Sequence, residues 1–467
     1  MLFGILAALV IAPTVIIAVL TILRKGRYPE KSYYNCFLNV ILGPMRYFKI
    51  GPYKQGKLDL QKAMRYAMKK TGLQDFGDTT FLDAYNVIFN TPAHQNLKLT
   101  NLGYIMYQIE LNQTMLRRLT FLQYLKDCSQ ITDVPVRSPV FVLGLPRTGT
   151  TFLHRLLSLD PAVRAPLLWE LLAPVPKVRG ESKVETFEND RNKRANAMRK
   201  LIKTRQSMGD NALQHIHEID ADLPEECIMA LTDELPIHMS CLYSAYMNFE
   251  IFLKENSGQR AINAYKHYKK VLQLLSYQVG EAKEPRRWML KCPIHLFYIK
   301  EIANVFPDAK LVWTHRHPVS AIPSMCSLVK SLHQVYYTNE TRDDAMLGKK
   351  IRDISHQYLL QTASDIETTG LDCANINYEN LVKDPIGTVK NIYNQFGWKV
   401  SDEYEKILKN YLHEDSLKRE SKKKELNHNK GVLHFYTPEE FSLTSNELCE
   451  GNFNEYTKKF NVPMSKN

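Results

Sequence analysis

The sequence has no Cys-x-x-Cys pair, although eight cysteines are spread through its 467 residues. Structural zinc sites and thioredoxin-like redox sites need two cysteines at such close spacing, so we expect neither, and no metal. Internal repeats and long low-complexity tracts are also missing, which excludes solenoid architectures and extended disorder. The composition, 44% hydrophobic and 24% charged, is that of a folded chain long enough for a large core domain with additional segments.

Acidic residues are the scarcer charge, because 49 Asp and Glu stand against 61 Lys and Arg and leave a net charge of +12. Such an excess is typical of a solvated basic surface, and also of a protein that meets an anionic ligand or an anionic membrane. We expect no nucleic-acid partner.

Charged side chains are absent from residues 1–23. As a helix this run would reach roughly 34 Å, enough to cross the hydrocarbon core of a bilayer. It lacks the basic start of a signal peptide, so we expect a single-pass transmembrane anchor, with a cleaved signal peptide as the alternative. Arg24, Lys25 and Arg27 follow the run, and the positive-inside rule would then put the rest of the chain in the cytosol.

Two regions with different patterns of apolar residues follow the anchor. Residues 24–135 space their apolar side chains three and four positions apart, which predicts a helical region. From residue 136 to residue 467, short apolar runs alternate with helical patterns, and such alternation predicts an α/β domain with a central parallel sheet. The runs that predict strands are 138–145, 287–292, 310–316 and, more weakly, 373–381. Residues 420–430 are highly charged and predict an exposed loop.

The stretch FVLGLPRTGTTFLHRLL, residues 141–157, has the pattern of a strand, a tight turn and a helix start. Free backbone N–H groups and the helix dipole make such a turn an anion site. Glycines let the backbone approach the ligand and threonines add hydroxyl donors; these residues are Gly144, Thr148, Gly149, Thr150 and Thr151. The turn lacks the lysine of a nucleotide triphosphatase loop, and its basic residue is Arg147 instead.

A second strand-to-helix turn, THRHPVSAIPS, supplies Arg316 and Ser324. An arginine at a strand end forks two N–H bonds to a phosphate, and a serine in the next helix adds a hydroxyl. This strand ends in arginine, where a magnesium-dependent nucleotide enzyme usually has an aspartate. Together the two turns predict a ligand with two separate phosphates rather than a metal-bound triphosphate.

The stretches PRTGTTFL and RHPVSAIPS together resemble the sulfotransferases that use 3′-phosphoadenosine 5′-phosphosulfate (PAPS). WMLKCPIHL and INYENLVKDP are similar to one branch, with bacterial, carbohydrate and tyrosyl-protein members. The resemblance covers residues 136 to about 443 and implies a three-layer P-loop α/β fold, with PAPS as co-substrate and no metal. It also implies a Golgi or endoplasmic-reticulum enzyme with a lumenal catalytic domain, against the charge rule.

The resemblance also implies roles for single residues. The first turn would hold the 5′-phosphosulfate, and Arg316 with Ser324 would hold the 3′-phosphate. The closing Arg-Lys-Gly element of the family is present in part, as Asn-Lys-Gly, which makes Lys430 a nucleotide contact. His317 stands where many members have aspartate.

Sulfuryl transfer needs charge stabilisation and a base. Arg147 is a permanent cation beside the negative charge that develops in the transition state. The acceptor hydroxyl must lose its proton, so a general base is expected. Glu170 has the place that several members give to a glutamate after the loop helix, and His217 is its rival.

Other interpretations stay open from the sequence. A P-loop kinase or nucleotide triphosphatase would bind magnesium and ATP, and a catalytically silent binding protein would keep the fold alone. We expect His154 to pack in the core, and Lys291 and His295 to line the site. The hydroxyl-bearing acceptor can be a carbohydrate, a tyrosyl peptide or a small lipid-like alcohol, and the oligomeric state stays open.

Overall fold

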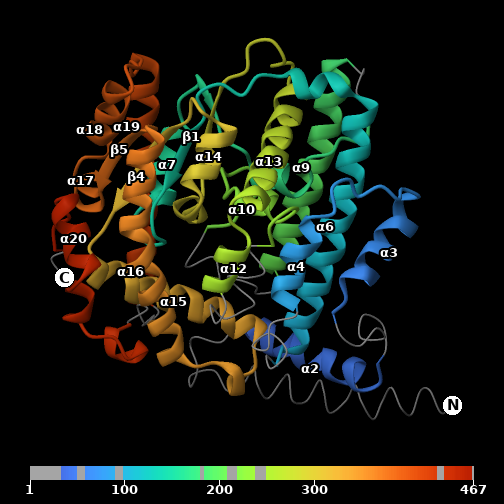
Figure 1. Cartoon of the computed structure of the whole chain (residues 1–467), viewed down its shortest axis with the longest axis horizontal. Helices are drawn as coiled ribbons and strands as arrows, with labels where there is room; N and C mark the ends of the chain where they lie inside the picture. The colour runs from blue at the N-terminus through green and yellow to red at the C-terminus, as the bar shows by residue number, and fades with distance from the viewer. Residues whose placement is uncertain are drawn as a thin grey trace.

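A five-stranded sheet lies at the centre of the chain (Figure 1). The computed structural model describes residues 33–49, 58–89, 98–178, 183–207, 218–236, 249–428 and 436–464. All neighbouring strands pair in parallel, in the order β2-β3-β1-β4-β5. Their bounds are β1 Val140–Leu143, β2 Val163–Arg164, β3 Arg287–Lys291, β4 Lys310–His315 and β5 Asp372–Asn377.

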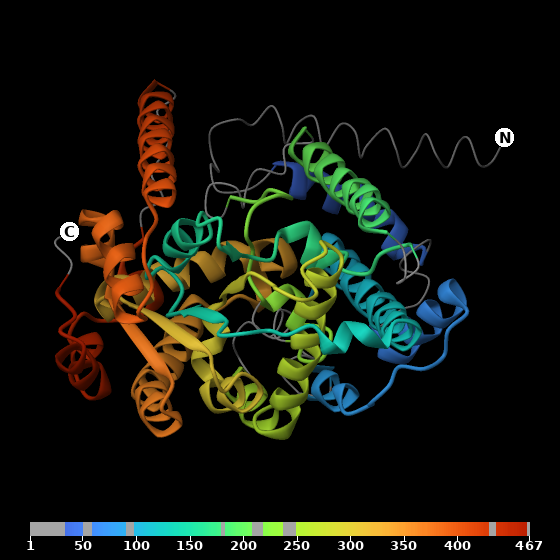
Figure 2. The ribbon, with the colours of Figure 1, turned by 90° about the horizontal axis from the view of Figure 1, so that it is seen from above.

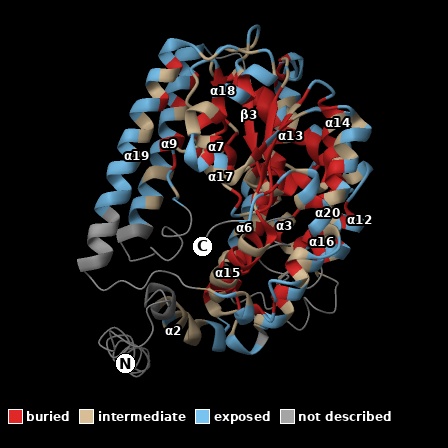
Figure 3. Cartoon of the chain, turned by 90° about the vertical axis from the view of Figure 1, so that its left-hand side faces the viewer, coloured by how far each residue is buried: buried red, intermediate tan, exposed pale blue. Residues whose placement is uncertain are grey.

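Alternate strand residues belong to two separate cores, because successive side chains of a strand point to opposite faces. Phe141 and Leu143 of β1 pack in the larger core, whereas Val140 and Val142 pack in the smaller one. The sheet is therefore covered on both sides, which confirms the predicted α/β fold with a parallel sheet. Figure 3 shows the buried sheet between helices whose outer faces are exposed.

The larger core is built mainly by helices that precede β3, by those between β3 and β5, and by the last helix of the chain. These are α3 Leu60–Thr71, α4 Phe81–Phe89, α6 Asn101–Asp127, α10 Ile228–Leu231, α12 Phe249–Glu255, α13 Gln259–Tyr277, α14 Ile299–Val305, α15 Pro318–Tyr336, α16 Asp344–Thr369 and α20 Asn452–Lys459. The smaller core is closed by α7 Thr150–Leu157, α17 Tyr378–Lys383, α18 Pro385–Gln395 and α19 Asp402–His428.

Three further helices lie at the edges of these layers: α2 Tyr33–Tyr47, α8 Leu168–Leu172 and α9 Val184–Ser207. Short 3-10 turns occur at Ser129–Asp133, Pro293–Phe297, Asn339–Thr341, Pro438–Phe441 and Glu447–Cys449.

The charged stretch 420–430 differs from the sequence prediction. Helix α19 continues through it to His428, so the expected loop is wrong for the part that the structure describes. Figure 2 shows α19 projecting from the body of the molecule. A projecting helix has little apolar face to bury, which explains why hydrophobic periodicity did not reveal it.

The predicted helical region packs on the α/β part. Helices α2, α3, α4 and α6 lie together on the side opposite β5 (Figure 1). On α6, Arg117 makes a bidentate bond to Asp233, with its Nε 2.8 Å from Oδ1, and Arg118 pairs with Glu234. The boundaries 24–135 and 136–467 stay predictions, since one core joins the two parts.

The predicted membrane anchor, residues 1–23, lies outside the described residues. Among the helices that the structure does describe, none is both long and apolar enough to span a bilayer.

Candidate active site

The loop between β1 and α7 has the backbone of an anion-binding turn. Gly144, Arg147 and Gly149 have positive φ values of 149°, 71° and 90°. A Cβ at Gly144 would lie 2.4 Å from Thr314 Oγ1, and one at Gly149 would lie 2.9 Å from Tyr378 Cδ2, so both positions need glycine. Helix α7 begins directly after Gly149, and its first N–H groups have no partner within the helix.

The two predicted phosphate turns meet at the carboxyl edge of the sheet. Strands β1 and β4 pair directly, with Leu143 opposite Trp313, so both turns start at the same level. Arg147 Nε donates to Ser324 Oγ at 3.2 Å, and Arg316 Nη1 donates to the carbonyl of Arg147 at 3.0 Å. The structure thus brings together the three side chains that the sequence assigned to two phosphates.

The surroundings of Arg316 fit an anionic group. Its guanidinium lies over the ring of Tyr378, 4.4 Å from the centroid, while its buried Nε has no hydrogen-bond partner among the described residues. A buried charged donor without a partner costs free energy that a phosphate oxygen would recover. His317 Nδ1 accepts from the N–H of Val319 at 3.4 Å, so it caps α15 as an aspartate would.

The threonines of the loop have different surroundings. Thr148 is buried and donates to the carbonyl of Leu145 at 2.6 Å, so its hydroxyl fixes the shape of the loop. Its backbone N–H is the group left for a ligand. Thr150 is also buried, and Thr151 Oγ1 lies 3.3 Å from Lys291 Nζ.

A carboxylate that the sequence did not single out lies next to this loop. Lys291 ends β3 and stands opposite Val142 in the register of β1 and β3. Its Nζ donates to Glu226 Oε1 at 2.7 Å. Lys291 is 1% exposed at its side chain and Glu226 is 25% exposed, so the carboxylate keeps access to solvent. The sequence placed Lys291 at the site, but its contact with Glu226 spans segments far apart in the chain.

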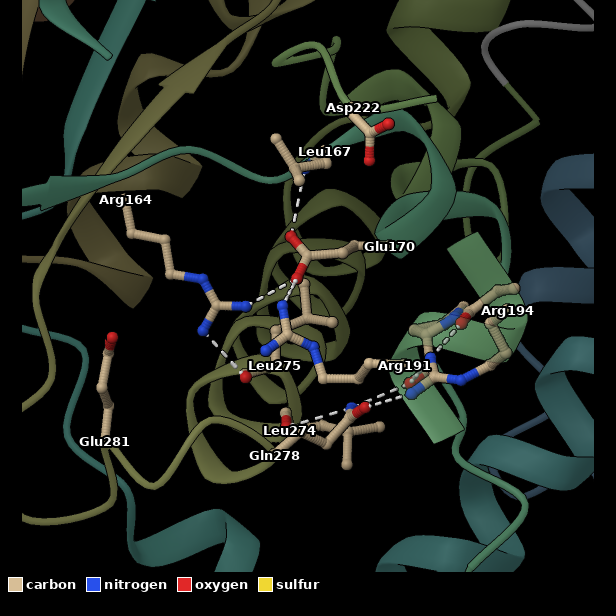
Figure 4. A network of polar contacts seen from close by, with 12 residues as sticks. Arg164, Leu167, Glu170, Arg191, Arg194, Asp222, Leu274, Leu275, Gln278 and Glu281 are labelled. Carbon is tan, nitrogen blue, oxygen red and sulfur yellow. Dashed lines mark hydrogen bonds and ion pairs between the residues drawn. The ribbon is translucent and has the colours of Figure 1, made fainter. Parts of the chain in front are cut away.

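Glu170 has a different setting from the one expected of a base (Figure 4). Its Oε1 accepts from Arg164 at 2.7 Å and from Arg191 at 3.0 Å, and its Oε2 accepts from the N–H of Leu167 at 3.1 Å. The side chain is 1% exposed. Two arginines therefore compensate the charge of Glu170, and its oxygens also cap α8; both contacts favour a structural role.

The histidines near the site pack in the core. His154 Nε2 bonds to the carbonyl of Met289 at 3.1 Å, as the packing prediction expected. His295 Nδ1 bonds to the hydroxyl of Tyr265 at 2.8 Å and lies inside the larger core, so it does not line the site. Burial lowers the pKa of each histidine to about 3, with Lys291 adding to the effect, and both are neutral at physiological pH. His217 and Lys430 lie outside the described residues.

Comparison with known proteins identifies one family. The profile of the Sulfotransferase family matches residues 139–402, which is more than half of the chain and includes both turns. The omega-hydroxy-beta-dihydromenaquinone-9 sulfotransferases Stf3 of Mycobacterium bovis and Mycobacterium tuberculosis are each 27% identical over 281 residues. This alignment covers 59% of the present chain and spans 66% of the length of these curated relatives.

Two solved structures share the fold. Sulfotransferase STF1 of Mycobacterium tuberculosis matches with a TM-score of 0.63 and 27% identity, over 86% of this chain and 98% of its own. STF9 of Mycobacterium avium matches with a TM-score of 0.69 and 23% identity, over 88% of this chain and 99% of its own.

The matches correct the expected location. The sequence resemblance implied a Golgi or endoplasmic-reticulum enzyme, but these relatives are mycobacterial proteins, and bacteria have neither compartment. Neither the Golgi location nor a membrane-spanning helix has support in the described residues. The Golgi location is therefore withdrawn as wrong, and the predicted anchor, residues 1–23, lies outside the described residues.

Proposed function

Since the chain belongs to the Sulfotransferase family, we propose that it transfers a sulfuryl group from PAPS to a hydroxyl of an acceptor molecule. The family and the curated relatives support sulfuryl transfer to an acceptor. The observation that carries the choice of PAPS is the junction of the two turns, in which Arg147 bonds to Ser324 and is itself bonded by Arg316. A donor with a 5′-phosphosulfate and a 3′-phosphate matches two anion sites that touch.

The two ends of the donor would bind to different groups. The backbone N–H groups from Thr148 to Thr151, with Gly149 giving close approach, would hold the 5′-phosphosulfate. Arg316 and Ser324 would hold the 3′-phosphate, and the partnerless Nε of Arg316 supports this assignment. Lys430 is proposed as a further contact on the basis of its motif.

Catalysis would depend on position and electrostatics. Sulfuryl transfer resembles phosphoryl transfer, in which charge gathers on the leaving oxygen and the protein mainly supplies fixed cations. Arg147 is exposed at the tip of the loop, so its guanidinium is free to face the transferring group. Lys291 brings a second cation to the side of Thr151.

We propose a lipid-like alcohol as the first acceptor class to test, ahead of carbohydrates and tyrosyl peptides. The support is the name of the curated relatives, which gives omega-hydroxy-beta-dihydromenaquinone-9 as their acceptor. The acceptor class rests on relatives that are 27% identical to this chain, whereas the donor assignment rests on the two turns. The two proposals are therefore independent of each other.

Transfer of labelled sulfate from PAPS to a panel of the three acceptor classes tests the function. We expect transfer by the wild type and a loss of about 10²–10³-fold in Arg147→Ala, the size seen when one charge-stabilising donor is removed. A wild-type protein that bound the product 3′-phosphoadenosine 5′-phosphate but transferred no sulfate to any class would point to a silent binding protein. A protein that bound ATP with magnesium instead would favour the kinase alternative.

A further inference from the structure

The carboxylate of Glu226 lies close to the phosphate loop. It is linked to the loop through one side chain, because Lys291 Nζ lies 2.7 Å from Glu226 Oε1 and 3.3 Å from Thr151 Oγ1. Strand β3 is the neighbour of β1 in the sheet, so Lys291 reaches the loop from the strand beside it. Glu226 therefore stands beside the proposed binding place of the 5′-phosphosulfate.

Main-chain and side-chain contacts fix the position of Glu226. The N–H of Cys227 donates to the carbonyl of Lys291 at 3.0 Å, which ties the segment to the end of β3. Cys292 Sγ donates to Glu226 Oε2 at 3.7 Å. Burial raises the pKa of the Cys292 thiol, so this group stays protonated and remains a donor.

A second anchor holds the same segment a few residues further on. Asp233 and Glu234 pair with Arg117 and Arg118 of α6, in a cluster that is almost wholly buried. The segment from Glu226 to Glu234 is thus attached to the sheet at one end and to the helical region at the other. A side chain held in this way has the preorganisation that proton transfer needs.

Lys291 places a positive charge beside Glu226, and the side chain of Glu226 keeps access to solvent. Burial alone would lower the pKa of Lys291, but Glu226 and Glu225 outweigh burial and raise it, so Lys291 is an ammonium at neutral pH. Glu170 has two arginines as partners and is 1% exposed, whereas Glu226 has one lysine and is 25% exposed.

We propose that Glu226, held on Lys291, accepts the proton of the acceptor hydroxyl during sulfuryl transfer; this inference rests on the proposed function. In the step, the acceptor oxygen forms a bond to sulfur while its proton passes to the carboxylate of Glu226. The bond between sulfur and the 5′-phosphate oxygen breaks, and its electron pair stays on that phosphate, next to Arg147 and Lys291. The proton then leaves Glu226 for solvent through its exposed face.

The test compares Glu226→Gln with Glu218→Gln, a matched control in the same segment. Glu218 is 61% exposed and pairs with Arg155, away from Lys291. We expect Glu226→Gln to lower the rate of transfer about 10²–10⁴-fold, the usual contribution of a general base. Its calorimetric affinity for 3′-phosphoadenosine 5′-phosphate is expected to stay within about twofold, whereas Glu218→Gln keeps both the rate and the affinity.

The pH profile separates a base from a structural residue. With a base in place, kcat/KM falls on the acid side as the carboxylate is protonated, and this limb is expected to vanish in Glu226→Gln. The transfer rate of Glu226→Gln should fall less with an acidic phenol as acceptor than with an aliphatic alcohol. A phenol loses its proton more readily and therefore depends less on a base. A wild-type rate in Glu226→Gln, an unchanged acid limb or a loss of nucleotide binding would each overturn the proposal. Failure of the wild type to bind the nucleotide or to transfer sulfate would instead sink the proposed function.

Discussion

Glu170 and Glu226 both follow the phosphate loop in the sequence, and both pair with basic side chains, but their surroundings differ. Glu170 is 1% exposed and has two arginines and a backbone N–H as partners. Glu226 is 25% exposed and has one lysine and one thiol. The almost fully buried carboxylate of Glu170 serves the fold, whereas the carboxylate of Glu226 keeps access to solvent beside the phosphate loop and is available for chemistry.

The largest expected effect is the loss of stability in Arg164→Met, which removes one of the two arginine partners of Glu170. The change keeps much of the volume but leaves the buried carboxylate of Glu170 short of one partner, since Arg191 alone remains. We expect a loss of about 3 kcal/mol in the free energy of unfolding, at the low end of the cost of breaking a buried ion pair, because Arg191 still compensates part of the charge. Denaturant unfolding measures it.

Arg155→Met is the control for that experiment. Arg155 pairs with Glu218, whose side chain is 61% exposed, so water replaces the lost partner. The control is expected to lose about 1 kcal/mol or less. Equal losses in the two variants would contradict a structural role for Glu170.

Much of the fold followed from the sequence because its signals are local. Apolar runs between helical patterns gave four of the five strands, but β2 has only Val163 and Arg164 and carries no such run. The helix α19 was missed beyond residue 420, because a projecting charged helix has no buried stripe. Packing of α6 against the α/β part is a tertiary property that no local pattern encodes.

The candidate site divides in the same way. Arg147, Arg316 and Ser324 belong to strand-to-helix turns with recognisable sequences, so the sequence alone predicts them as phosphate contacts. Glu226 becomes a candidate only through its contact with Lys291, which joins two distant segments. The sequence neighbours of Glu170 are apolar, so the sequence shows no sign of the two arginines that pair with it in the structure.

A smaller effect is expected from Lys291→Met on the Glu226 side. Transfer should fall about 10²-fold, since one cation beside the developing charge is lost and Glu226 loses its anchor. The free energy of unfolding should change far less than in Arg164→Met, because Glu226 can be solvated through its exposed face. Steady-state transfer and denaturant unfolding on the same preparation measure both quantities.

Lys300→Met gives the reference for that variant. Lys300 is 57% exposed and pairs with Asp365 at 2.8 Å on the surface. We expect no change in transfer rate. Lys291→Met could instead destabilise the protein as much as Arg164→Met and leave the activity per folded molecule unchanged. That result would contradict the difference between a structural Glu170 and a catalytic Glu226.

The smallest expected effect is a pH dependence in the cluster that anchors the Glu226 segment. His267 Nδ1 lies 3.2 Å from Glu234 Oε1, and its Nε2 lies 3.7 Å from Asp233 Oδ2, with Arg117 and Arg118 on the far side of both acids. Burial alone would lower the pKa of His267, but its bonds to the two acids outweigh burial and raise the pKa above the ordinary 6.5.

The sign of the effect follows from that raised pKa. The protonated imidazole stabilises the folded state fully below pH 6.5, the ordinary value, and this stability is lost as the pH rises through the higher pKa of the folded protein. His267→Gln should therefore destabilise the protein more at about pH 5.5 than at about pH 8.5. Thermal melts at the two pH values measure the difference, and an equal or reversed difference would show that His267 is neutral in the fold.

The central claim is that two joined turns hold a donor with two phosphates, and titration calorimetry with 3′-phosphoadenosine 5′-phosphate tests it most directly. We predict that 3′-phosphoadenosine 5′-phosphate binds without magnesium. Adenosine 5′-phosphate lacks the group that Arg316 and Ser324 would hold, so its affinity should be at least about tenfold lower. ATP with magnesium should also bind more weakly than 3′-phosphoadenosine 5′-phosphate. Equal affinity for the nucleotides with and without the 3′-phosphate, or tighter binding of ATP with magnesium, would contradict the account.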